Sequence, residues 1–407
     1  MKTVGIIAEY NPFHNGHFYQ LHELRSRTGA DFVVAAMSGD FVQRGEPAIY
    51  DKYTRTRMAL SAGVDLVLEL PACFATGSAE GFAACGVALL DRLGVVDILG
   101  FGSESGDMEK LSQTASVLIR EPEDYSSQLR TFLRQGMSFP KARAAALNAC
   151  DPDALLASPN NILGVEYLKA LGQRNSSIKP VTIRRAGQGY HETSPVSQDV
   201  FASASAIRSA IRDQNFPVVH GQVPGAVFAL LEHLEPVFPD DLTPLLNARL
   251  LDLSHTGGKS SFSDYADMSP ELASRLGRDI LNFATFSGRI MQLKTRSYTY
   301  TRISRALLHL LLGITAEQAS YYKNLDYVCY ARILGFRRQA APLLSRLKRT
   351  SSLPLVTKTA NAPKILNRDA LSLLQMDFHA SHLYQSLIYA KSGRLMPNEY
   401  TRSVIVL

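Results

Sequence analysis

Tryptophan is absent from this 407-residue sequence, cysteine occurs only four times, and no long uninterrupted apolar run is present. The cysteines (Cys73, Cys85, Cys150 and Cys329) form no Cys-x-x-Cys pair, so we expect reduced thiols and no disulfide framework or zinc ribbon. Without about 18 consecutive apolar residues, no segment can span a bilayer as a helix. Glu9 interrupts the first apolar run too early for a secretory signal. These absences predict a soluble cytoplasmic protein with no membrane partner.

Charge is distributed unevenly along the chain, whose formal net charge is +6. Residues 1–215 contain 21 Lys and Arg against 23 Asp and Glu, whereas residues 216–407 contain 22 against 14. The excess is concentrated between Arg289 and Arg349, where 12 basic residues stand against only two acidic ones. A neutral front half and a basic back half predict a catalytic domain at 1–215 and a polyanion-binding domain at 216–407.

The first two hundred residues alternate between short apolar runs and amphipathic segments. Runs rich in Val, Ile and Leu that are apolar on both faces are typical of strands in a covered parallel sheet. The predicted strands are Thr3–Ala8, Asp31–Met37, Val64–Leu70, Val96–Phe101 and Pro180–Arg184. With helices between them, they predict an α/β fold, a Rossmann-like doubly wound parallel sheet whose ligand site lies at the carboxyl ends of the strands.

The second half of the chain has few strand signals and begins with a proline-punctuated stretch between Pro217 and Pro244. We expect this half to be mostly helical. The predicted helices are Pro270–Ala284, Thr301–Leu312, Thr315–Lys323, Tyr327–Leu334 and Ala340–Lys348.

The most informative segment follows the first predicted strand, where the chain turns at Asn11-Pro12 and a helix opens at His14-Asn15-Gly16-His17. Gly16 allows a ligand to approach the backbone closely, and free N–H groups at a helix N-terminus attract phosphate. Two imidazoles three residues apart can donate hydrogen bonds to one phosphate group. A surface histidine pair or half of a metal site is the ordinary alternative. Because no third metal ligand is evident, the strand–turn–helix context favours phosphate binding.

Phe13-His14-Asn15-Gly16-His17 resembles the HxGH motif of HIGH-signature nucleotidyltransferases, which attack the α-phosphate of ATP and release pyrophosphate. The sequence contains neither a P-loop nor a GxGxxG after a strand, so those nucleotide-binding modes are disfavoured. Four further blocks narrow the resemblance, namely Met37–Ala48, Phe101–Gly106, Ser158–Tyr167 and Lys294–Arg302. Together, from residue 1 to at least Gly335, the blocks resemble the bacterial tRNA(Met) cytidine acetate ligase family.

The resemblance implies that His14 and His17 are catalytic and stabilise the pentavalent α-phosphate and the leaving group. It also implies an ATP-binding set that comprises Ile7, Ala8, Glu9, Tyr10, Asn11, Pro12, Phe13, His14, Asn15, Gly16, His17, Phe18, Tyr19, Gln20, Gly102, Asn160 and Arg185. The register leaves Asn160 or Asn161 open, and we prefer Asn160 because it directly follows Pro159. It likewise leaves Arg184 or Arg185 open, and we prefer Arg185.

Ordinary structural roles compete with these assignments. Gly102 can be a plain turn glycine, Asn160 can cap the helix predicted at Ile162–Leu171, and Arg185 can be an exposed cation beside Arg184. Capping and ligand contact are compatible, because both use a helix N-terminus. An arginine at a strand end can also bind a phosphate in bidentate fashion.

Two other groups of residues are open to more than one interpretation. Ser203, Ser205 and Arg208 resemble a late Ser-x-Ser/Thr-x-Ile-Arg element of related adenylyltransferases, and an ordinary capped helix is nearly as good an explanation. Whether they bind phosphate is left open. A basic cluster after the second strand can meet phosphate or tRNA, although a solvated charged face is the usual explanation; it consists of Arg44, Lys52, Arg55 and Arg57.

The basic back half carries the predicted RNA-binding residues. Basic residues supply phosphate contacts, and Tyr298 and Tyr300 are candidates for stacking on unpaired bases. A helical domain with a cationic solvated face is the alternative, and the choice of tRNA rests on the resemblance alone. The candidate tRNA-binding residues are Lys294, Arg296, Arg302, Arg305, Arg337 and Arg338.

The resemblance implies a complete reaction. Acetate and ATP form acetyl-adenylate with loss of pyrophosphate, and the acetyl group passes to N4 of the wobble cytidine (position 34) of elongator tRNA(Met), with AMP as the second product. Mg²⁺ is expected with the ATP phosphates, although no protein ligand set for a metal is visible. The alternatives are an adenylyltransferase acting on a cofactor precursor and a non-catalytic tRNA-binding protein. Acetate selectivity and oligomeric state are not determined by the sequence.

Overall fold

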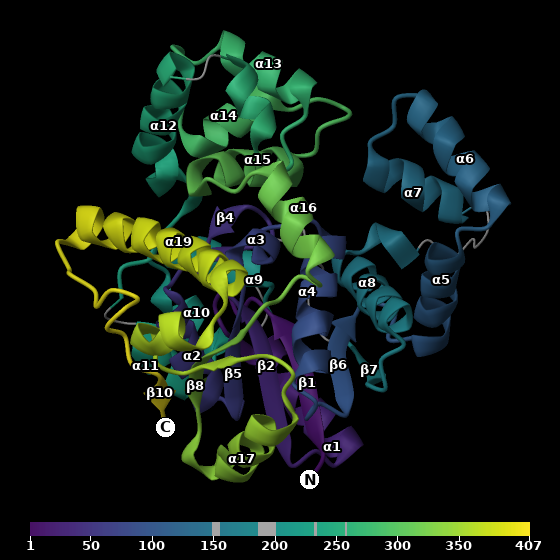
Figure 1. Ribbon diagram of the computed structural model, residues 1–407, viewed down its shortest axis with the longest axis vertical. Helices are drawn as coiled ribbons and strands as arrows, with labels where there is room; N and C mark the ends of the chain where they lie inside the picture. The colour runs from purple at the N-terminus through teal and green to yellow at the C-terminus, as the bar shows by residue number, and fades with distance from the viewer. Residues whose placement is uncertain (149–154, 186–200, 232–233, 257–258) are drawn as a thin grey trace.

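A computed structural model describes residues 1–148, 155–185, 201–231, 234–256 and 259–407 (Figure 1). Its centre is a sheet in which five parallel strands follow the order β5-β2-β1-β6-β7. The strands are β1 (Thr3–Ala8), β2 (Phe32–Ser38), β5 (Leu66–Leu70), β6 (Ile98–Ser103) and β7 (Lys179–Arg184). All five strands expected from the sequence are present, and the prediction of a doubly wound parallel α/β sheet is confirmed.

Successive side chains of each strand pack into the hydrophobic cores on opposite faces of the sheet, as a sheet covered on both faces requires. Val4 and Ile6 of β1 join the core formed with α1, α2 and the helices after residue 203, whereas Ile7 joins the core on the opposite face. Helix α4 packs very closely on that opposite face, because a Cβ on its Gly86 would lie only 2.6 Å from Ile7. The helices around the sheet are α1 (Asn15–Thr28), α2 (Lys52–Ser61), α3 (Ala72–Ala75), α4 (Ala79–Arg92) and α8 (Pro159–Arg174).

The second half of the chain also contributes to the sheet, and one sequence prediction is wrong for this reason. The segment Tyr327–Leu334, expected to be a helix, instead leads into strand β8 (Ala331–Phe336), which pairs antiparallel with β5. Its residues are buried on both faces, so the apolar run fits an inner strand as well as a buried helix. Strands β9 (Leu355–Val356) and β10 (Ile405–Val406) pair parallel with β8. The sheet therefore continues past residue 216, and the division into domains there stays a prediction.

Helices dominate the rest of the second half, as expected. In Figure 1, α12, α13, α14 and α15 lie above the sheet, α10 and α11 lie at its left beside α2, and α17 lies at its lower edge. The expected helix Pro270–Ala284 ends earlier, at Arg278, and a new helix begins at Phe286. The helices are α9 (Ala204–Arg212), α10 (Phe216–Gln222), α11 (Gly225–Leu231), α12 (Thr243–Thr256), α13 (Pro270–Arg278), α14 (Phe286–Leu293), α15 (Tyr300–Leu312), α16 (Ala316–Asn324), α17 (Ala341–Thr350), α18 (Ala362–Ile365) and α19 (Arg368–Ser392).

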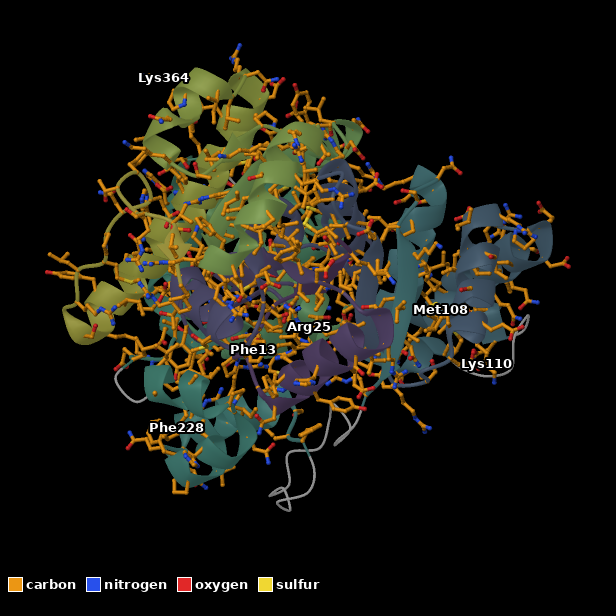
Figure 2. The ribbon with its side chains drawn as sticks, turned by 90° about the horizontal axis from the view of Figure 1, so that it is seen from below. Phe13, Arg25, Met108, Lys110, Phe228 and Lys364 are labelled. Atoms are coloured by element: carbon orange, nitrogen blue, oxygen red, sulfur yellow. The ribbon has the colours of Figure 1, made fainter. Side chains whose placement is uncertain are left out.

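An arm of three helices extends from the side of the sheet that carries β7 (Figure 1). Met108, at the start of this arm, packs against the main hydrophobic core, and Figure 2 shows Met108 and Lys110 on the side of the molecule that carries the arm. Among the described residues, no helix combines the length and apolar character needed to cross a membrane. Cys73, Cys85 and Cys329 are free thiols, and Cys150 lies outside the described residues. The arm consists of α5 (Met108–Arg120), α6 (Glu123–Arg134) and α7 (Phe139–Asn148).

A buried ionic cluster joins the two halves of the chain. Lys52 Nζ lies 2.7 Å from a carboxylate oxygen of Glu69 and 3.0 Å from one of Glu399, and Arg332 pairs with both acids. These four side chains are at most 3% exposed. Lys52 also donates a hydrogen bond to Ser381 of α19 at 2.7 Å. The cluster therefore ties β5 and α2 to β8, α19 and the C-terminal segment.

This cluster corrects the interpretation of the basic residues after the second strand as a solvated or phosphate-binding group. Lys52 and Arg55 are both fully buried, and only Arg57 of the four is exposed. The guanidinium of Arg55 donates to main-chain carbonyls of Glu9, Ser38, Gly39 and Tyr50. Because the carbonyls of Glu9, Ser38 and Gly39 lie at or just after the ends of β1 and β2, Arg55 holds the loops that follow the two strands.

Candidate active site

The strand order places a crevice beside the carboxyl end of β1. From β1 the sheet runs to β2 on one side and to β6 on the other, and ligands bind at such a switch point in open α/β sheets. A cavity of about 150 Å³ opens there, and a smaller hollow adjoins it beside Gly16, Tyr19 and Arg184. The cavity is lined by Ile6, Ile7, Ala8, Glu9, Tyr10, Asn11, His17, Gln20, Gln43, Phe82, Phe101, Gly102, Asn160, Leu163, Tyr167, Arg185 and Ala204.

The structure brings ten of the predicted ATP-binding residues to this cavity, from four separate parts of the chain. Five residues of the segment Ile7–Gln20 line neither the cavity nor the smaller hollow. Phe13, near the middle of Figure 2, is fully buried and packs its ring 5.5 Å from that of His17. Asn15 donates to the carbonyl of Gly221 at 3.1 Å, and Phe18 is 40% exposed. The five are Pro12, Phe13, His14, Asn15 and Phe18.

Two histidines form the N-terminus of α1. His14 is the N-cap residue, and its Nδ1 accepts a hydrogen bond from the N–H of Gly16 at 3.0 Å. His17 Nδ1 accepts in turn from the N–H of His14 at 3.3 Å, so the pair forms a reciprocal capping box. The rings stack with centroids 3.8 Å apart. A nitrogen that accepts a hydrogen bond carries no proton, so both neutral rings have their N–H at Nε2.

The capping box changes how this helix end can bind an anion. The sequence predicted free N–H groups at this helix N-terminus, but the N–H of Gly16 donates to the ring of His14. The outward-facing donor is instead the Nε2–H of an imidazole, and His17 lies in the cavity wall. Since the positive end of the helix dipole lies at the same point, the site still favours a negatively charged group.

Both imidazoles are neutral at physiological pH. Burial, together with the charges of Arg185 and Arg208, lowers the pKa of His14 to about 3. Burial also lowers the pKa of His17 well below its ordinary value, with His14 and Arg185 contributing in the same direction. The two rings therefore act as hydrogen-bond donors that carry no charge of their own.

The low pKa of His14 predicts that folding stability falls in acid. His14 binds a proton below pH 6.5 in the unfolded chain but only below about pH 3 in the folded one. Lowering the pH from 8 to 5 should therefore remove about 2 kcal/mol of stability through this residue. His14→Gln removes that contribution, so the stability difference between wild type and variant should shrink by this amount over the same range.

Chemical denaturation of both proteins at pH 5, 6, 7 and 8 measures this difference. Burial raises the pKa of Asp377 to about 7, so this residue makes the opposite contribution to the pH dependence of stability. Because both proteins contain Asp377, its contribution cancels when the variant is compared with wild type. A stability difference that stays constant between pH 8 and pH 5 would contradict the neutral assignment of His14.

Glu104 arranges the far wall of the cavity. Its carboxylate accepts hydrogen bonds from the main-chain N–H of Asn160 at 3.2 Å, from the Asn160 side-chain amide at 2.7 Å and from the N–H of Asn161 at 2.8 Å. Asn160 therefore does not cap α8, as one interpretation of the sequence had it; α8 begins at Pro159, and Glu104 satisfies its first N–H groups. Sequence reasoning assigned no role to Glu104, although it lies within the Phe101–Gly106 block.

The sequence left two choices of residue open, and in the structure the two members of each pair occupy different positions. Asn160 and Arg185 line the cavity, whereas Asn161 is buried and accepts a hydrogen bond from the N–H of Ser105 at 3.1 Å. Arg184 borders only the smaller hollow. A Cβ on Gly102 would lie 3.3 Å from Arg185 Cγ, so the absent side chain lets Arg185 lie across the end of β6. The segment 186–200 that follows lies outside the described residues.

Several cavity residues were missed from the sequence. Gln43 follows β3 (Phe41–Val42), and its N–H donates to Glu9 at 2.9 Å, which fixes that carboxylate at the rim. Phe82, Leu163 and Tyr167 provide the apolar part of the wall. Gln43 lies inside the block Met37–Ala48, and Leu163 and Tyr167 lie inside the block Ser158–Tyr167, so the resemblance to the family could have pointed to them. Phe82 has no such signal, because it looks like any other apolar residue of α4.

Helix α9 braces the loop that leads into α1. Ser203 caps this helix by accepting from the N–H of Ala206 at 3.1 Å. Arg208 donates to the main-chain carbonyl of Asn11 at 2.9 Å and to Ser205 at 3.2 Å. These contacts give Arg208 a structural role beside the cavity, and phosphate binding by Ser203, Ser205 and Arg208 stays a prediction.

The structure divides the candidate tRNA-binding residues between two edges of the sheet. Lys294 and Arg296 are exposed ahead of α15, which is anchored to the site by a 2.9 Å hydrogen bond from Ser304 to the carbonyl of Gly45. Arg337 and Arg338 follow β8, whose end lies beside the start of β5 and thus at the edge opposite the cavity.

Other members of the basic segment already have partners. Arg305 forms a two-point ion pair with Asp267 at 2.8 and 3.2 Å. The Arg302 guanidinium lies 5.0 Å from the centre of the Tyr298 ring. Tyr298 is only 6% exposed and bonds through its hydroxyl to Ser269 and Glu271, so the expectation that it stacks on bases is wrong. Tyr300 lines a groove and keeps that possibility.

The HIGH nucleotidyl transferase family model matches residues 1–398. The tRNA(Met) cytidine acetate ligase of Acetivibrio thermocellus is 39% identical over 421 aligned residues that cover 100% of both chains. That of Caldanaerobacter subterraneus is 43% identical and covers 88% of this chain and 89% of its own. The chain belongs to the tRNA(Met) cytidine acetate ligase family.

Two crystal structures of Thermotoga maritima TmcAL support the same assignment. The apo form superposes with a TM-score of 0.93 and the form bound with alpha-thio ATP with 0.91. Each is 32% identical to this chain and covers 100% of both chains. The family predicted from the sequence blocks is therefore confirmed, and the ligase family shares its fold over the whole length of this chain.

Proposed function

We propose that this member of the tRNA(Met) cytidine acetate ligase family is an ATP-dependent ligase that acetylates N4 of the wobble cytidine of elongator tRNA(Met). The observation that carries the proposal is the pair of stacked neutral imidazoles at the N-terminus of α1, set at the switch point of the sheet. Family membership supplies the identity of the acceptor, and the site supplies the chemistry at a phosphate.

In the first step, an acetate oxygen attacks the α-phosphorus of ATP, and the bond to the bridging oxygen of pyrophosphate breaks. Negative charge grows on the equatorial oxygens in the transition state. His17 donates an Nε2–H from the cavity wall, His14 fixes the orientation of His17 by stacking, and Arg185 supplies a positive charge. Neutral imidazoles suit this role, because they remain donors throughout the neutral pH range.

In the second step, N4 of the cytidine attacks the carbonyl carbon of acetyl-adenylate, AMP leaves, and the amine loses a proton. No covalent acyl-enzyme is required, because the mixed anhydride is already activated. Lys294, Arg296 and Arg302 are the residues we propose for tRNA phosphate contacts, since their segment precedes or begins α15, which is anchored beside the cavity.

Mg²⁺ is proposed as the companion of the ATP phosphates and has no dedicated protein site here. Within the described residues, no group of three or more His, Cys, Asp or Glu side chains could hold a metal ion. Mg²⁺ commonly keeps several waters and binds through phosphates with few protein ligands. Its contribution would be to neutralise phosphate charge, and the roles of His14, His17 and Arg185 do not depend on it.

Acetylation of purified tRNA by this protein tests the proposal. With labelled acetate and ATP, we expect label on elongator tRNA(Met), together with stoichiometric pyrophosphate, and none on a transcript with uridine at position 34. Pyrophosphate release with a stable adenylylated small molecule would instead indicate a cofactor adenylyltransferase. Binding of tRNA without pyrophosphate release would leave only a non-catalytic RNA-binding function.

A further inference from the structure

A second groove lies next to the ATP cavity and has no role in the site described above. It has a volume of about 560 Å³, within the range typical of small-molecule sites. Its walls come from the hairpin strand β4 (Glu46–Pro47), from α9, from the segment Val237–Asp240 and from the first residue of α15, Tyr300. It therefore lies between the sheet and the basic helical layer.

The groove and the ATP cavity share helix α9. Ala204 lines the cavity, whereas Ser205 and Arg208 line the groove. Arg208 spans the short distance between them, because its guanidinium donates to the carbonyl of Asn11, itself a cavity residue. A group seated in the groove would thus lie close to an α-phosphate held at the N-terminus of α1.

Glu46 is the acidic side chain of the groove that has no partner. Among the described residues no hydrogen bond or ion pair reaches its carboxylate, whereas the groove's other acid, Asp240, accepts two hydrogen bonds from Ser287 at 2.8 Å. Burial raises the pKa of Glu46, Glu9 adds to this rise, and the charges of Arg208, Arg44 and Arg212 oppose it. The carboxylate of Glu46 is half-buried and open to the groove, so it can accept a hydrogen bond from a ligand there. The exocyclic amine of cytosine is a donor that Glu and Asp accept in nucleic-acid recognition.

Two further residues of the groove, Tyr300 and Arg212, suit the rest of a nucleotide. Tyr300 offers an aromatic ring that is only half-buried. The Arg212 side chain is exposed, and its guanidinium carbon lies 5.0 Å from the centre of the Phe238 ring, within the range of a cation–π contact. Aromatic and guanidinium planes stack on unpaired bases, and arginine also pairs with phosphate.

We propose that this groove is the acceptor-nucleotide site, in which Glu46 accepts a hydrogen bond from N4 of an unpaired cytidine and Arg212 contacts an adjoining base or phosphate. This proposal rests on the proposed function, since it places the acceptor of the same reaction. A uridine presents an O4 acceptor at the equivalent position, which the Glu46 carboxylate would repel, so Glu46 determines the choice of base.

Two variants and a matched control test the proposal. Glu46→Gln replaces the carboxylate with an amide that can either accept or donate, and Arg212→Ala removes the cation. Arg120→Ala, an exposed arginine at the end of α5, is the control. We would measure binding of anticodon stem-loop RNAs with cytidine or uridine at position 34, acetylation kinetics, and binding of alpha-thio ATP.

Wild type and Arg120→Ala should bind the cytidine stem-loop about tenfold or more tightly than the uridine one. Glu46→Gln should bind the two about equally, and Arg212→Ala should raise KM for the tRNA several-fold, with alpha-thio ATP binding unchanged in both. If wild type acetylates tRNA and both variants match it in base discrimination and KM, the groove is not the acceptor site. If wild type itself fails to acetylate, the proposed function falls, and the groove assignment falls with it.

Discussion

Replacing His17 by alanine is expected to lower kcat/KM for tRNA acetylation by about 100- to 1,000-fold, the effect of removing one preorganised donor to a developing oxyanion. His17 is the histidine of the pair that lines the cavity, and its Nδ1 is occupied by the N–H of His14, so its Nε2–H is the donor left for the α-phosphate. The effect should appear in kcat more than in ATP affinity, because the charge grows only in the transition state.

Steady-state acetylation and the rate of pyrophosphate release measure this effect, and binding of alpha-thio ATP measures the ground state. His22→Ala is the matched control, because His22 lies on the same helix but is exposed. A His17→Ala enzyme that keeps wild-type kcat would overturn the assignment of His17 as a catalytic donor. A large loss in the His22 variant would show instead that damage to α1 is responsible.

Replacing Lys52 by methionine is expected to destabilise the fold by about 3–5 kcal/mol, the cost of leaving a buried charge without its partner. Lys52 pairs with Glu69 and Glu399, which are at most 3% exposed, and Arg332 alone would then face both carboxylates. The loss should be larger than for an ordinary surface ion pair, because water cannot solvate the two acids.

Thermal and urea unfolding, followed by circular dichroism, measure the change. Arg130→Ala is the control, since it breaks the pair with Glu123 in which both side chains are at least 60% exposed, and such pairs contribute about 1 kcal/mol or less. Equal unfolding midpoints for the two variants would contradict the assignment of Lys52 to a buried cluster that joins the two halves of the chain.

The arrangement of the chain explains how one fold can serve two substrates. The parallel sheet presents a phosphate site at the carboxyl end of β1, and the β3–β4 hairpin extends from the same edge to meet α15. Gly45 makes this contact possible, because a Cβ there would lie 2.4 Å from the main-chain nitrogen of Arg305. The basic helical layer is thereby held against the nucleotide site rather than attached by a loose linker.

The sequence by itself determined the five parallel strands of the sheet and the nucleotide-binding segment. The five strands could be read from it because each is a short run of β-branched and aliphatic residues between turn signals, a pattern set by local burial on both faces. The segment Ile7–Gln20 could be identified because its strand, turn and helix are consecutive, so the relevant contacts are local. His14 and His17 illustrate this point, since their capping box involves residues only three positions apart.

Only the tertiary structure decided which charges are free and which are buried. Lys52 and Arg55 look like surface cations in the sequence, yet their partners lie on other strands and at the far C-terminal end of the chain. The sequence of β8 was interpreted as a helix because a short apolar run fits a buried helix and a buried strand equally well. Its antiparallel pairing with β5 decided the conformation. Long-range partners determine these features, and a local pattern carries no information about which distant residue will satisfy a charge or a backbone hydrogen bond.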